Sequence, residues 1–265
     1  MIKLCKEEQK NSILKYIGED YYKCIYLYMN LEKYGCENEN VKVYVAANEK
    51  GETTAVFLKY FNCLHVFSKN EDVFASDIDQ VVLLSNPRVM FLSDESQKKM
   101  SASWREKYNV FYDTLFEAVR YEDEEDSLEL VQASMSELDE IVEFLMSDEF
   151  YASIYEKEAL KKQMRERMED NYSRSFVMRN DGNIVFHMAT TAELPEFMIG
   201  GLGLLHTSMR GCGMGKRCFA KFYNNILCMG VKCYCFPADE RAYNLHKKLG
   251  FKIKHTPVKM VLKQV

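Results

Sequence analysis

Residues 209–217 read MRGCGMGKR and pack three glycines into five positions. The whole chain of 265 residues contains only 12 glycines, so this density needs a physical reason. Downstream, apolar residues recur at helical spacing from Phe219 to Leu227, which predicts an amphipathic helix. The glycines therefore lie in a turn that joins an apolar, strand-like segment to the first turn of this helix.

The start of such a helix is suited to an anion. Backbone N–H groups there have no partner within the helix, and the helix dipole adds partial positive charge. Glycine lets a ligand approach those groups closely, and Arg210, Lys216 and Arg217 add formal positive charge. The pattern indicates a phosphate or pyrophosphate site; the alternative is a glycine-rich connection that only turns tightly.

Two familiar nucleotide-binding patterns do not fit this loop. The P-loop pattern GxxxxGK[ST] needs Ser or Thr after its lysine to hold magnesium, and residue 217 is Arg. The dinucleotide pattern GxGxxG would need glycine at position 216, which is Lys. The preceding strand also belongs to a series of hairpins rather than to a βαβ unit.

Composition limits the function classes. With 47% apolar residues, a net charge of −5 and a pI near 5.7, the chain is typical of a soluble globular protein and not of one that binds nucleic acid or membranes through its general surface. Its first residues become charged at once, unlike a secretion signal. The nine scattered cysteines indicate free thiols in a reducing cytoplasm, and Cys233 and Cys235 are interpreted as core residues, so no metal site is expected.

The second half of the chain predicts an ordered series of elements. Ser134 and Glu137 form a capping box before the helix LDEIVEFLM, and a second helix follows around residues 156–170. Two strands flank the turn Asn-Asp-Gly-Asn at 180–183, and the strand FMIGGLGLL leads into the glycine loop. After the loop come a helix, the strand VKCYCF, another helix, and the last strands FKIKH and VKMVLK.

The first half shows a similar order of elements, although its residues differ. Its final strand is expected in NVFYDTLFEAV, residues 109–119. At the position of the glycine loop it has SKNEDVF, residues 68–74, without any glycine. The acidic stretch YEDEEDS, residues 121–127, is interpreted as a linker or a solvated loop. We therefore expect a duplicated fold, with domains at residues 1–125 and 126–265, in which the second copy alone keeps the loop.

Two motifs in the second half carry a resemblance to a known family. Residues 210–215 match the pattern R-x-x-G-x-G. Residues 239–251, DERAYNLHKKLGF, resemble N-x-x-A-x-x-L-Y-x-x-x-G-F, with Ala242, Leu245, Gly250 and Phe251 in register. In this order and at this separation, the motifs resemble the acyl-coenzyme A loop and the last helix of the GNAT N-acetyltransferase superfamily. The resemblance covers about residues 128–265.

The resemblance implies a fold, a cofactor and an activity. The fold would be α/β (α+β), with two tandem GNAT-like domains, each a mixed, mostly antiparallel sheet flanked by helices. The activity would be direct transfer of an acetyl group from acetyl-CoA, acting as co-substrate, to a primary amine of a small molecule or peptide. The acyl groups would exclude amino-acyl groups, and no metal would take part.

Site residues are carried over position by position. The family's loop holds the pyrophosphate, and its preceding strand is bulged, leaving a gap for the pantetheine arm and a backbone N–H for the thioester oxyanion. The implied cofactor-binding residues are Gly203, Leu204, Leu205, Arg210, Gly211, Cys212, Gly213, Met214, Gly215 and Lys216. For Gly200, Gly201 and Gly203 the alternative is an ordinary core strand that contains glycine.

The chain departs from the family at the catalytic acid. Most members place a tyrosine where this sequence has His246, so His246 is the implied acid for the leaving thiolate. An imidazole N–H can donate that proton, but an inert helix residue is an equal alternative. Glu193, Glu196, His187 and His206 are weaker candidates for the base that deprotonates the amine.

Partner and localisation follow from the same considerations. The expected partner is the amine substrate, with neither nucleic acid nor membrane; a homodimer is left open and the location is the cytoplasm. The aromatic stretch 21–28 is interpreted as the buried side of a helix rather than as a cleft. The alternative function, motivated by His246, is a non-catalytic acyl-CoA-binding regulatory protein.

Overall fold

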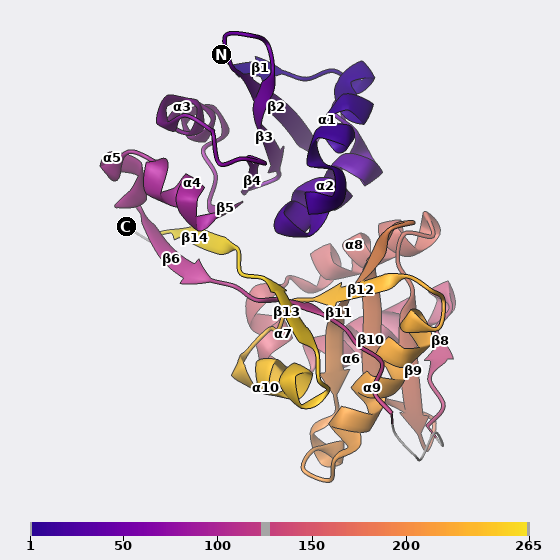
Figure 1. Ribbon diagram of the computed structural model, residues 1–265. Coiled ribbons are helices and arrows are strands. Elements are labelled where there is room, and N and C mark those ends of the chain that lie inside the picture. Colours follow the sequence, from indigo (N-terminus) through magenta and orange to yellow (C-terminus); the bar gives the residue numbers. More distant parts are fainter. Residues whose placement is uncertain (1, 123–127, 264–265) are drawn as a thin grey trace. The chain divides into compact units, whose positions relative to one another are not determined.

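The computed structural model describes residues 2–122 and 128–263, which form two compact units. The first comprises Met1–Thr114 with His255–Val265, and the second Leu115–Lys254. Each unit contains a mixed, mostly antiparallel seven-stranded sheet flanked by helices (Figure 1). The α/β class and the two similar sheets expected from the sequence are therefore confirmed.

The first unit has strands β1 (Ile2–Leu4), β2 (Val41–Ala47), β3 (Thr53–Tyr60), β4 (Cys63–Phe67), β5 (Val89–Leu92), β6 (Tyr108–Tyr112) and β14 (Val258–Leu262). Its helices are α1 (Lys10–Ile17), α2 (Ile25–Tyr34), α3 (Ala75–Ser85), α4 (Asp94–Lys99) and α5 (Ala102–Arg105), with short 3₁₀ turns at Glu7–Gln9 and Gly18–Cys24. The sheet order is β1-β2-β3-β4-β5-β14-β6, and β4 and β5 are parallel.

The second unit has strands β7 (Leu115–Glu117), β8 (Val131–Gln132), β9 (Ser175–Asn180), β10 (Asn183–Glu193), β11 (Phe197–Leu205), β12 (Lys232–Cys235) and β13 (Lys252–His255). Its helices are α6 (Leu138–Met146), α7 (Glu149–Ile154), α8 (Lys157–Glu169), α9 (Met214–Leu227) and α10 (Glu240–Lys248), with short 3₁₀ turns at Met135–Glu137 and Thr207–Met209. The sheet order is β13-β7-β12-β11-β10-β9-β8, and β11 and β12 are parallel.

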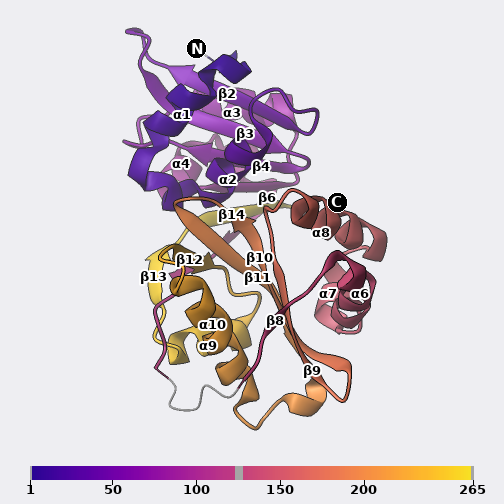
Figure 2. The same ribbon diagram turned by 90° about the vertical axis from the view of Figure 1, so that its right-hand side faces the viewer.

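Two hydrophobic clusters cover opposite faces of the second sheet. On one face, Phe222, Tyr223 and Ile226 of α9 pack on the strands. On the other face, Ile141 and Leu145 of α6 do so. Figure 2 shows α9 and α10 on one side of these strands and α6, α7 and α8 on the other. The apolar residues of α6 and α9 recur at helical spacing, so burying them gives each helix its orientation on the sheet.

The local signals of the sequence are found in the expected places. The main-chain N–H of Ser134 donates to the Glu137 carboxylate at 2.8 Å, which completes the capping box ahead of α6. The turn at Asp181 and Gly182 joins β9 to β10, and both residues have positive φ. These features depend on neighbours along the chain, so local chemistry is sufficient to predict them.

The two sheets place corresponding strands in the same order, with the parallel pair at the same point. In each sheet, the strand next to the parallel pair does not come from the continuous stretch of chain that supplies the other six strands. That place is filled by β14, from the end of the chain, in the first sheet and by β7 in the second. The similar layout of the two halves therefore extends to the strand order.

One strand expectation is wrong, and the expected boundaries differ from the division into units. Residues 109–119 form two strands, β6 and β7, which belong to different sheets. The last two expected strands also belong to different sheets: β13 lies in the second and β14 in the first. Only pairing with distant strands decides this, and hydrophobic alternation does not encode it. The units divide at Leu115 and again at His255. The expected boundary at 125/126 and residues 123–127 of the acidic stretch lie outside the described residues.

No helix in the described ranges combines the length and the apolar character that crossing a bilayer requires.

The first sheet depends on β14, which allows a test by mutation. Met260 of β14 is fully buried between β5 and β6, so Met260→Ala should lower the free energy of unfolding of the first unit by about 2–5 kcal/mol. The chain has a single tryptophan, Trp104, which packs against this core, so its fluorescence during urea denaturation reports this unit. Met135→Ala, at an exposed methionine, is the matched control. Equal midpoints for the two variants would contradict the assigned place of β14.

Candidate active site

One cavity of about 530 Å³ in the second unit contains most of the residues singled out from the sequence. It is lined by Asp148, Phe150, Tyr151, Gly203, Leu204, Leu205, Arg210, Gly211, Gly213, Gly215, Lys216, Phe219, Ala238, Asp239, Arg241, Ala242, Leu245 and Lys248. These residues come from the end of β11, the loop and first turns of α9, helix α10, and helix α7. The lining combines an apolar wall with backbone groups and several charges.

The cavity begins where two parallel strands part. The β11–β12 ladder runs from Phe197↔Lys232 to Gly200↔Cys235 and stops there. On its other side β11 stays paired with β10 as far as Leu205. The last residues of β11 therefore keep one neighbouring strand and lose the other, which leaves backbone groups on the β12 side facing the cavity.

A β-bulge makes β11 diverge. Between the pairs His187↔Leu204 and Ala189↔Gly201, β10 has one intervening residue and β11 has two. The extra residue bends the strand. Leu202 has φ +53°, a left-handed conformation that costs a residue with a side chain about 1–2 kcal/mol.

Two side chains bind the carbonyls of this bulge. The ring nitrogen Nδ1 of His187 lies 2.7 Å from the carbonyl oxygen of Leu202. The hydroxyl of Tyr151 donates to the carbonyl oxygen of Gly203 at 3.0 Å. Gly203 itself has no room for a side chain, because a Cβ there would lie 2.6 Å from the Met188 sulfur. The backbone is thus fixed in a form that a regular strand does not adopt.

The glycine loop presents bare backbone groups. Gly211 and Gly213 have φ +86° and +82°, and a Cβ on either would meet nothing within 4 Å, so conformation rather than packing requires glycine here. The first hydrogen bond of α9 is from the N–H of Arg217 to the carbonyl of Gly213. Within the described chain, no acceptor is found for the N–H groups of residues 211–216. These groups form a cradle suited to an anion.

Arg210 supports the loop as well as the cavity. Its Nε donates to the carbonyl of Leu205 at 2.9 Å, and its Nη2 lies 3.0 Å from Oδ2 of Asp148. Asp148 also caps α7 by accepting the N–H of Phe150. The side chain of Arg210 therefore ties the end of β11, the loop and α7 together, while its charge remains at the cavity wall.

Further cations line the same cavity. Lys216 belongs to the first turn of α9, and its Nζ lies 4.4 Å above the Tyr121 ring. Arg241 and Lys248 come from α10, and both are exposed. With Arg210 they give the cradle a positive surround that favours a multiply charged phosphate group.

His246 lies behind the cavity wall. Its ring is 3% exposed, stacks on Phe251 with an interplanar angle of 8°, and lies 6.3 Å, centroid to centroid, from the ring of Phe219, which lines the cavity. Its Nε2 is 3.8 Å from the Cys235 sulfur, whereas Nδ1 has no partner among the described residues. Burial lowers the pKa of His246 to about 4, so the ring is neutral at pH 7.

The structure brings most of the expected loop residues into one lining and leaves others out. Gly203, Leu204, Leu205, Arg210, Gly211, Gly213, Gly215 and Lys216 all line the cavity. Cys212, Met214 and His246 are outside this lining. Their expected roles stay predictions.

The sequence patterns did not indicate the contribution of α7 or of the two cations of α10. Helix α7 supplies Phe150 and Tyr151, and Asp148 precedes it as its N-cap. The helix has six residues, too few for a clear periodic signal, although Asp148 is a typical capping residue. Arg241 and Lys248 lie in the first and the last turn of a predicted helix, where only docking of α10 reveals which face meets the cavity.

The weaker base candidates also have definite positions. Glu193 is paired with Arg174 at 2.7 Å and accepts the hydroxyl of Thr190, so it stabilises the strands. His206 is exposed and accepts the N–H of Ser208. His187 is fully buried, and Glu196 does not line the cavity.

The corresponding turn of the first unit is built differently. Residues 68–74 carry Glu71 at φ +56°, and its carboxylate accepts hydrogen bonds from the hydroxyls of Ser93 and Ser96 at 2.8 and 3.1 Å. Near this turn, hydroxyl donors are therefore occupied by the carboxylate of Glu71. The first copy, which lacks the glycines of the loop, thus has a negative side chain of its own at this place.

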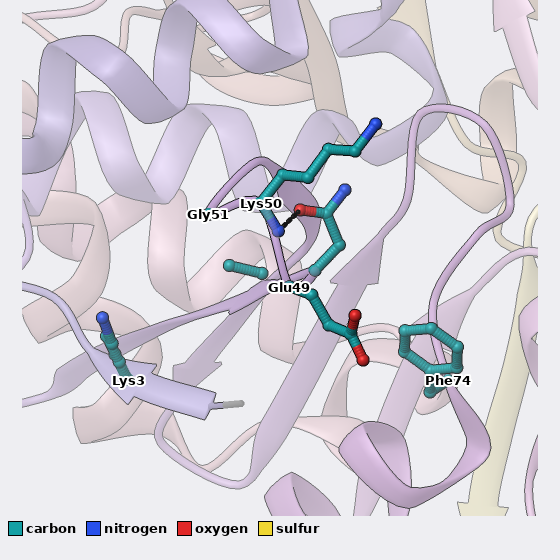
Figure 3. A pocket seen from close by; sticks show the side chains of 7 residues that line it. Lys3, Glu49, Lys50, Gly51 and Phe74 are labelled. Atoms are coloured by element: carbon teal, nitrogen blue, oxygen red, sulfur yellow. Dashed lines mark hydrogen bonds between the residues drawn. The ribbon is translucent and has the colours of Figure 1, made fainter.

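A second cavity, of about 760 Å³, lies in the first unit beside the turn between β2 and β3 (Figure 3). Lys3, Glu49, Lys50 and Phe74 point in different directions around it. Asn48 is engaged within its own turn, where its Oδ1 accepts the N–H of Lys50 at 3.0 Å. Although this cavity is larger, its polar groups do not converge, so it is the weaker candidate site. In the described residues, no group of three or more His, Cys, Asp and Glu side chains is placed to hold a metal ion.

Comparison with known proteins adds a fold assignment. No protein-family model matches the sequence, and no curated protein does. Among solved structures, the chain resembles a GNAT-family acetyltransferase from Colwellia psychrerythraea, with 13% identity, a TM-score of 0.64 and coverage of 99% of this chain and 100% of that one. A GCN5-related N-acetyltransferase from Sphaerobacter thermophilus gives 13% identity, a TM-score of 0.69 and coverage of 98% and 94%.

A third solved structure bears on the duplication. A tandem GNAT protein from the clavulanic acid biosynthesis pathway shares 10% identity over 98% of each chain, with a TM-score of 0.59. At these identities the likeness concerns the fold. The chain has the GNAT fold in tandem, and the resemblance inferred from the two sequence motifs is confirmed at this level.

Burial of His246 predicts a pH dependence of stability. The pKa is lower in the folded protein than the ordinary value of 6.5, so unfolding takes up a proton and stability is complete above about pH 6.5 and lost as the pH falls towards 4. Between pH 7 and pH 5, the free energy of unfolding should fall by about 2 kcal/mol less in His246→Leu than in the unchanged protein. Urea denaturation followed by circular dichroism measures this difference.

The control is Asn244→Leu, an exposed position of the same helix that does not titrate. It should keep the pH dependence of the unchanged protein. An equal loss of stability in the His246 variant and the unchanged protein would show that the ring is not buried in neutral form.

Proposed function

We propose that this protein is an N-acetyltransferase that transfers an acetyl group from acetyl-CoA to a primary amine of a small molecule or peptide. One observation supports it above all: the edge of β11 that is no longer covered by β12 and the bare N–H groups of the glycine loop open into the same cavity. A backbone edge beside an anion cradle is suited to a ligand with an amide-bearing arm and a diphosphate. The GNAT fold in tandem agrees with this function.

The chemistry of the lining fits coenzyme A. Residues 211–216 would hold the diphosphate through backbone N–H groups, with Lys216 and Arg210 supplying charge. Residues 203–205 would pair with the arm, next to the apolar side chains of Phe219 and Leu245. The positive φ of Gly211 and Gly213 and the open space around them support this use of the loop.

Acetyl-CoA would supply a thioester carbon for attack by the amine nitrogen. The chain would contribute orientation along β11 and a backbone N–H of residues 203–205 for the oxyanion. The amine must lose a proton and the departing sulfur must gain one. Among the described residues, the lining contains two carboxylates, Asp148 and Asp239, and Asp148 is held by Arg210.

His246 is retained as the proposed acid for the departing sulfur, with a structural condition. A pKa of about 4 keeps the ring neutral, so its N–H can donate a hydrogen bond to the departing sulfur, and the proton that the sulfur gains is the one that the amine loses. Because His246 is buried and does not line the cavity, whereas its neighbour Phe219 does, side chains of the cavity wall must move before His246 reaches a ligand. The buried position also favours the second candidate function, a regulatory protein that binds acyl-CoA without turning it over.

The compartment and the partner are proposed from composition and charge. All nine cysteines are free thiols, which favours a reducing compartment, and we propose the cytoplasm. The amine substrate is the proposed partner, since the net charge of −5 does not favour nucleic acid.

Binding of coenzyme A tests the role of the loop. Gly213→Ala forces a left-handed alanine into the cradle, so we expect at least tenfold weaker binding of CoA in calorimetry. Gly230→Ala is the matched control, because Gly230 also has φ +80° and open space around it but lies beyond the other end of α9. Equal affinities for the two variants, or no binding to the unchanged protein, would sink the proposal.

Turnover separates the two candidate functions. Release of free thiol from acetyl-CoA in the presence of primary amines should be fast with the unchanged protein and at least tenfold slower in His246→Leu, with CoA affinity retained. Tight CoA binding without thiol release for any amine would favour the regulatory protein. Undiminished release in the His246 variant would remove that residue from the mechanism and leave the enzyme assignment intact.

A further inference from the structure

The bulge in β11 needs a group that holds it. Leu202 adopts φ +53°, which a branched side chain rarely adopts, and an extra residue interrupts the ladder with β10 at this point. A left-handed residue turns its carbonyl relative to those of a regular strand. In the interior that oxygen must still accept a hydrogen bond.

The group that satisfies it is the His187 ring. Nδ1 lies 2.7 Å from the Leu202 carbonyl oxygen, and because a carbonyl only accepts, Nδ1 must carry the hydrogen. The side chain is fully buried, and Nε2 has no partner within the described residues. A buried, neutral imidazole with its proton on Nδ1 is thus a donor aimed at one oxygen.

We propose that His187 is a positioning residue that holds β11 in its bulged form and so keeps open the strand edge that the proposed acyl-CoA site uses. His187 does not line the cavity, so it acts through Leu202 and Gly203 rather than by touching a ligand. The proposal rests on the proposed function only for its effect on binding; its effect on the backbone is independent.

Its geometry argues against the alternative role of a base. The ring has no exposed surface and faces a carbonyl, which offers no proton to remove. Burial also lowers the pKa of His187 to about 4, so the neutral form that donates to Leu202 is the one present at pH 7.

Loss of the ring would leave two unfavourable choices. The Leu202 carbonyl could remain without its donor, or β11 could shift its register. A shift by one residue would exchange Leu204 and Leu205 between the two faces of the sheet, although each packs in a different hydrophobic cluster. We therefore expect local opening of residues 201–205 rather than a regular strand.

The first experiment needs no ligand, and it uses a variant only to assign the signals. Long-range ¹H–¹⁵N correlation NMR of the ¹⁵N-histidine-labelled protein at pH 7 reports which ring nitrogen is protonated. We expect His187, assigned by loss of its signals in His187→Asn, to be a neutral ring with the hydrogen on Nδ1. A hydrogen on Nε2, or on both nitrogens, would overturn the proposal.

The second experiment uses paired substitutions. His187→Leu removes the donor, whereas His187→Asn keeps an N–H at nearly the same place. Amide hydrogen exchange should be at least tenfold faster at residues 201–205 in the leucine variant and within threefold of the unchanged protein in the asparagine variant. His65→Leu, which removes a buried imidazole of the first unit, is the control and should leave these amides unchanged.

Uniformly faster exchange across the whole second sheet in His187→Leu, or a failure of asparagine to restore protection, would overturn the proposal. CoA affinity completes the test: a tenfold or larger loss in His187→Leu, with recovery in His187→Asn, is expected. If the unchanged protein does not bind CoA, the proposed function fails, while the tautomer and the exchange pattern still decide the role of His187. If the exchange pattern holds but affinity is unchanged, His187 shapes the strand without serving the site.

Discussion

The candidate site depends on the parting of β11 from β12. Parallel strands normally stay paired along their length, because each unpaired N–H and C=O in the interior costs free energy. Here the ladder ends at Gly200↔Cys235, directly before the bulge at Leu202. The donors of His187 and Tyr151 offset the cost by binding the carbonyls of Leu202 and Gly203.

The glycine loop follows from the same divergence. Residues 203–205 end β11 at the cavity, and the loop returns the chain to start α9 beside them. Arg210 links the two, because it donates to the carbonyl of Leu205 and pairs with Asp148. Strand edge, anion cradle and α7 are thus held as one local assembly within the second unit. The first unit repeats the strand order but has Glu71, bonded to Ser93 and Ser96, near the equivalent turn.

The sequence predicted what is encoded by neighbours along the chain. The capping box at Ser134, the turn at Gly182 and the helix after the glycine loop were all legible, because each depends on residues a few positions apart. The division of residues 109–119 into two strands could not be predicted in this way, because β6 is defined by its pairing with β14 and β7 by its pairing with β12. His187 looked like an ordinary strand histidine, because its partner, Leu202, is 15 positions away across a bulge.

By itself, therefore, the sequence predicted the order of helices and strands, the duplication of that layout, and a glycine-rich turn at the start of α9 that is suited to an anion. These follow from glycine conformation, helix ends and hydrophobic periodicity, which act over short stretches of chain. Only the tertiary structure decided that β7 and β14 enter their particular sheets, that α7 and α10 complete the cavity, and that His246 is buried outside the cavity lining. The physical reason is that strand pairing and helix docking bring together residues far apart in sequence, and burial then sets their protonation and access.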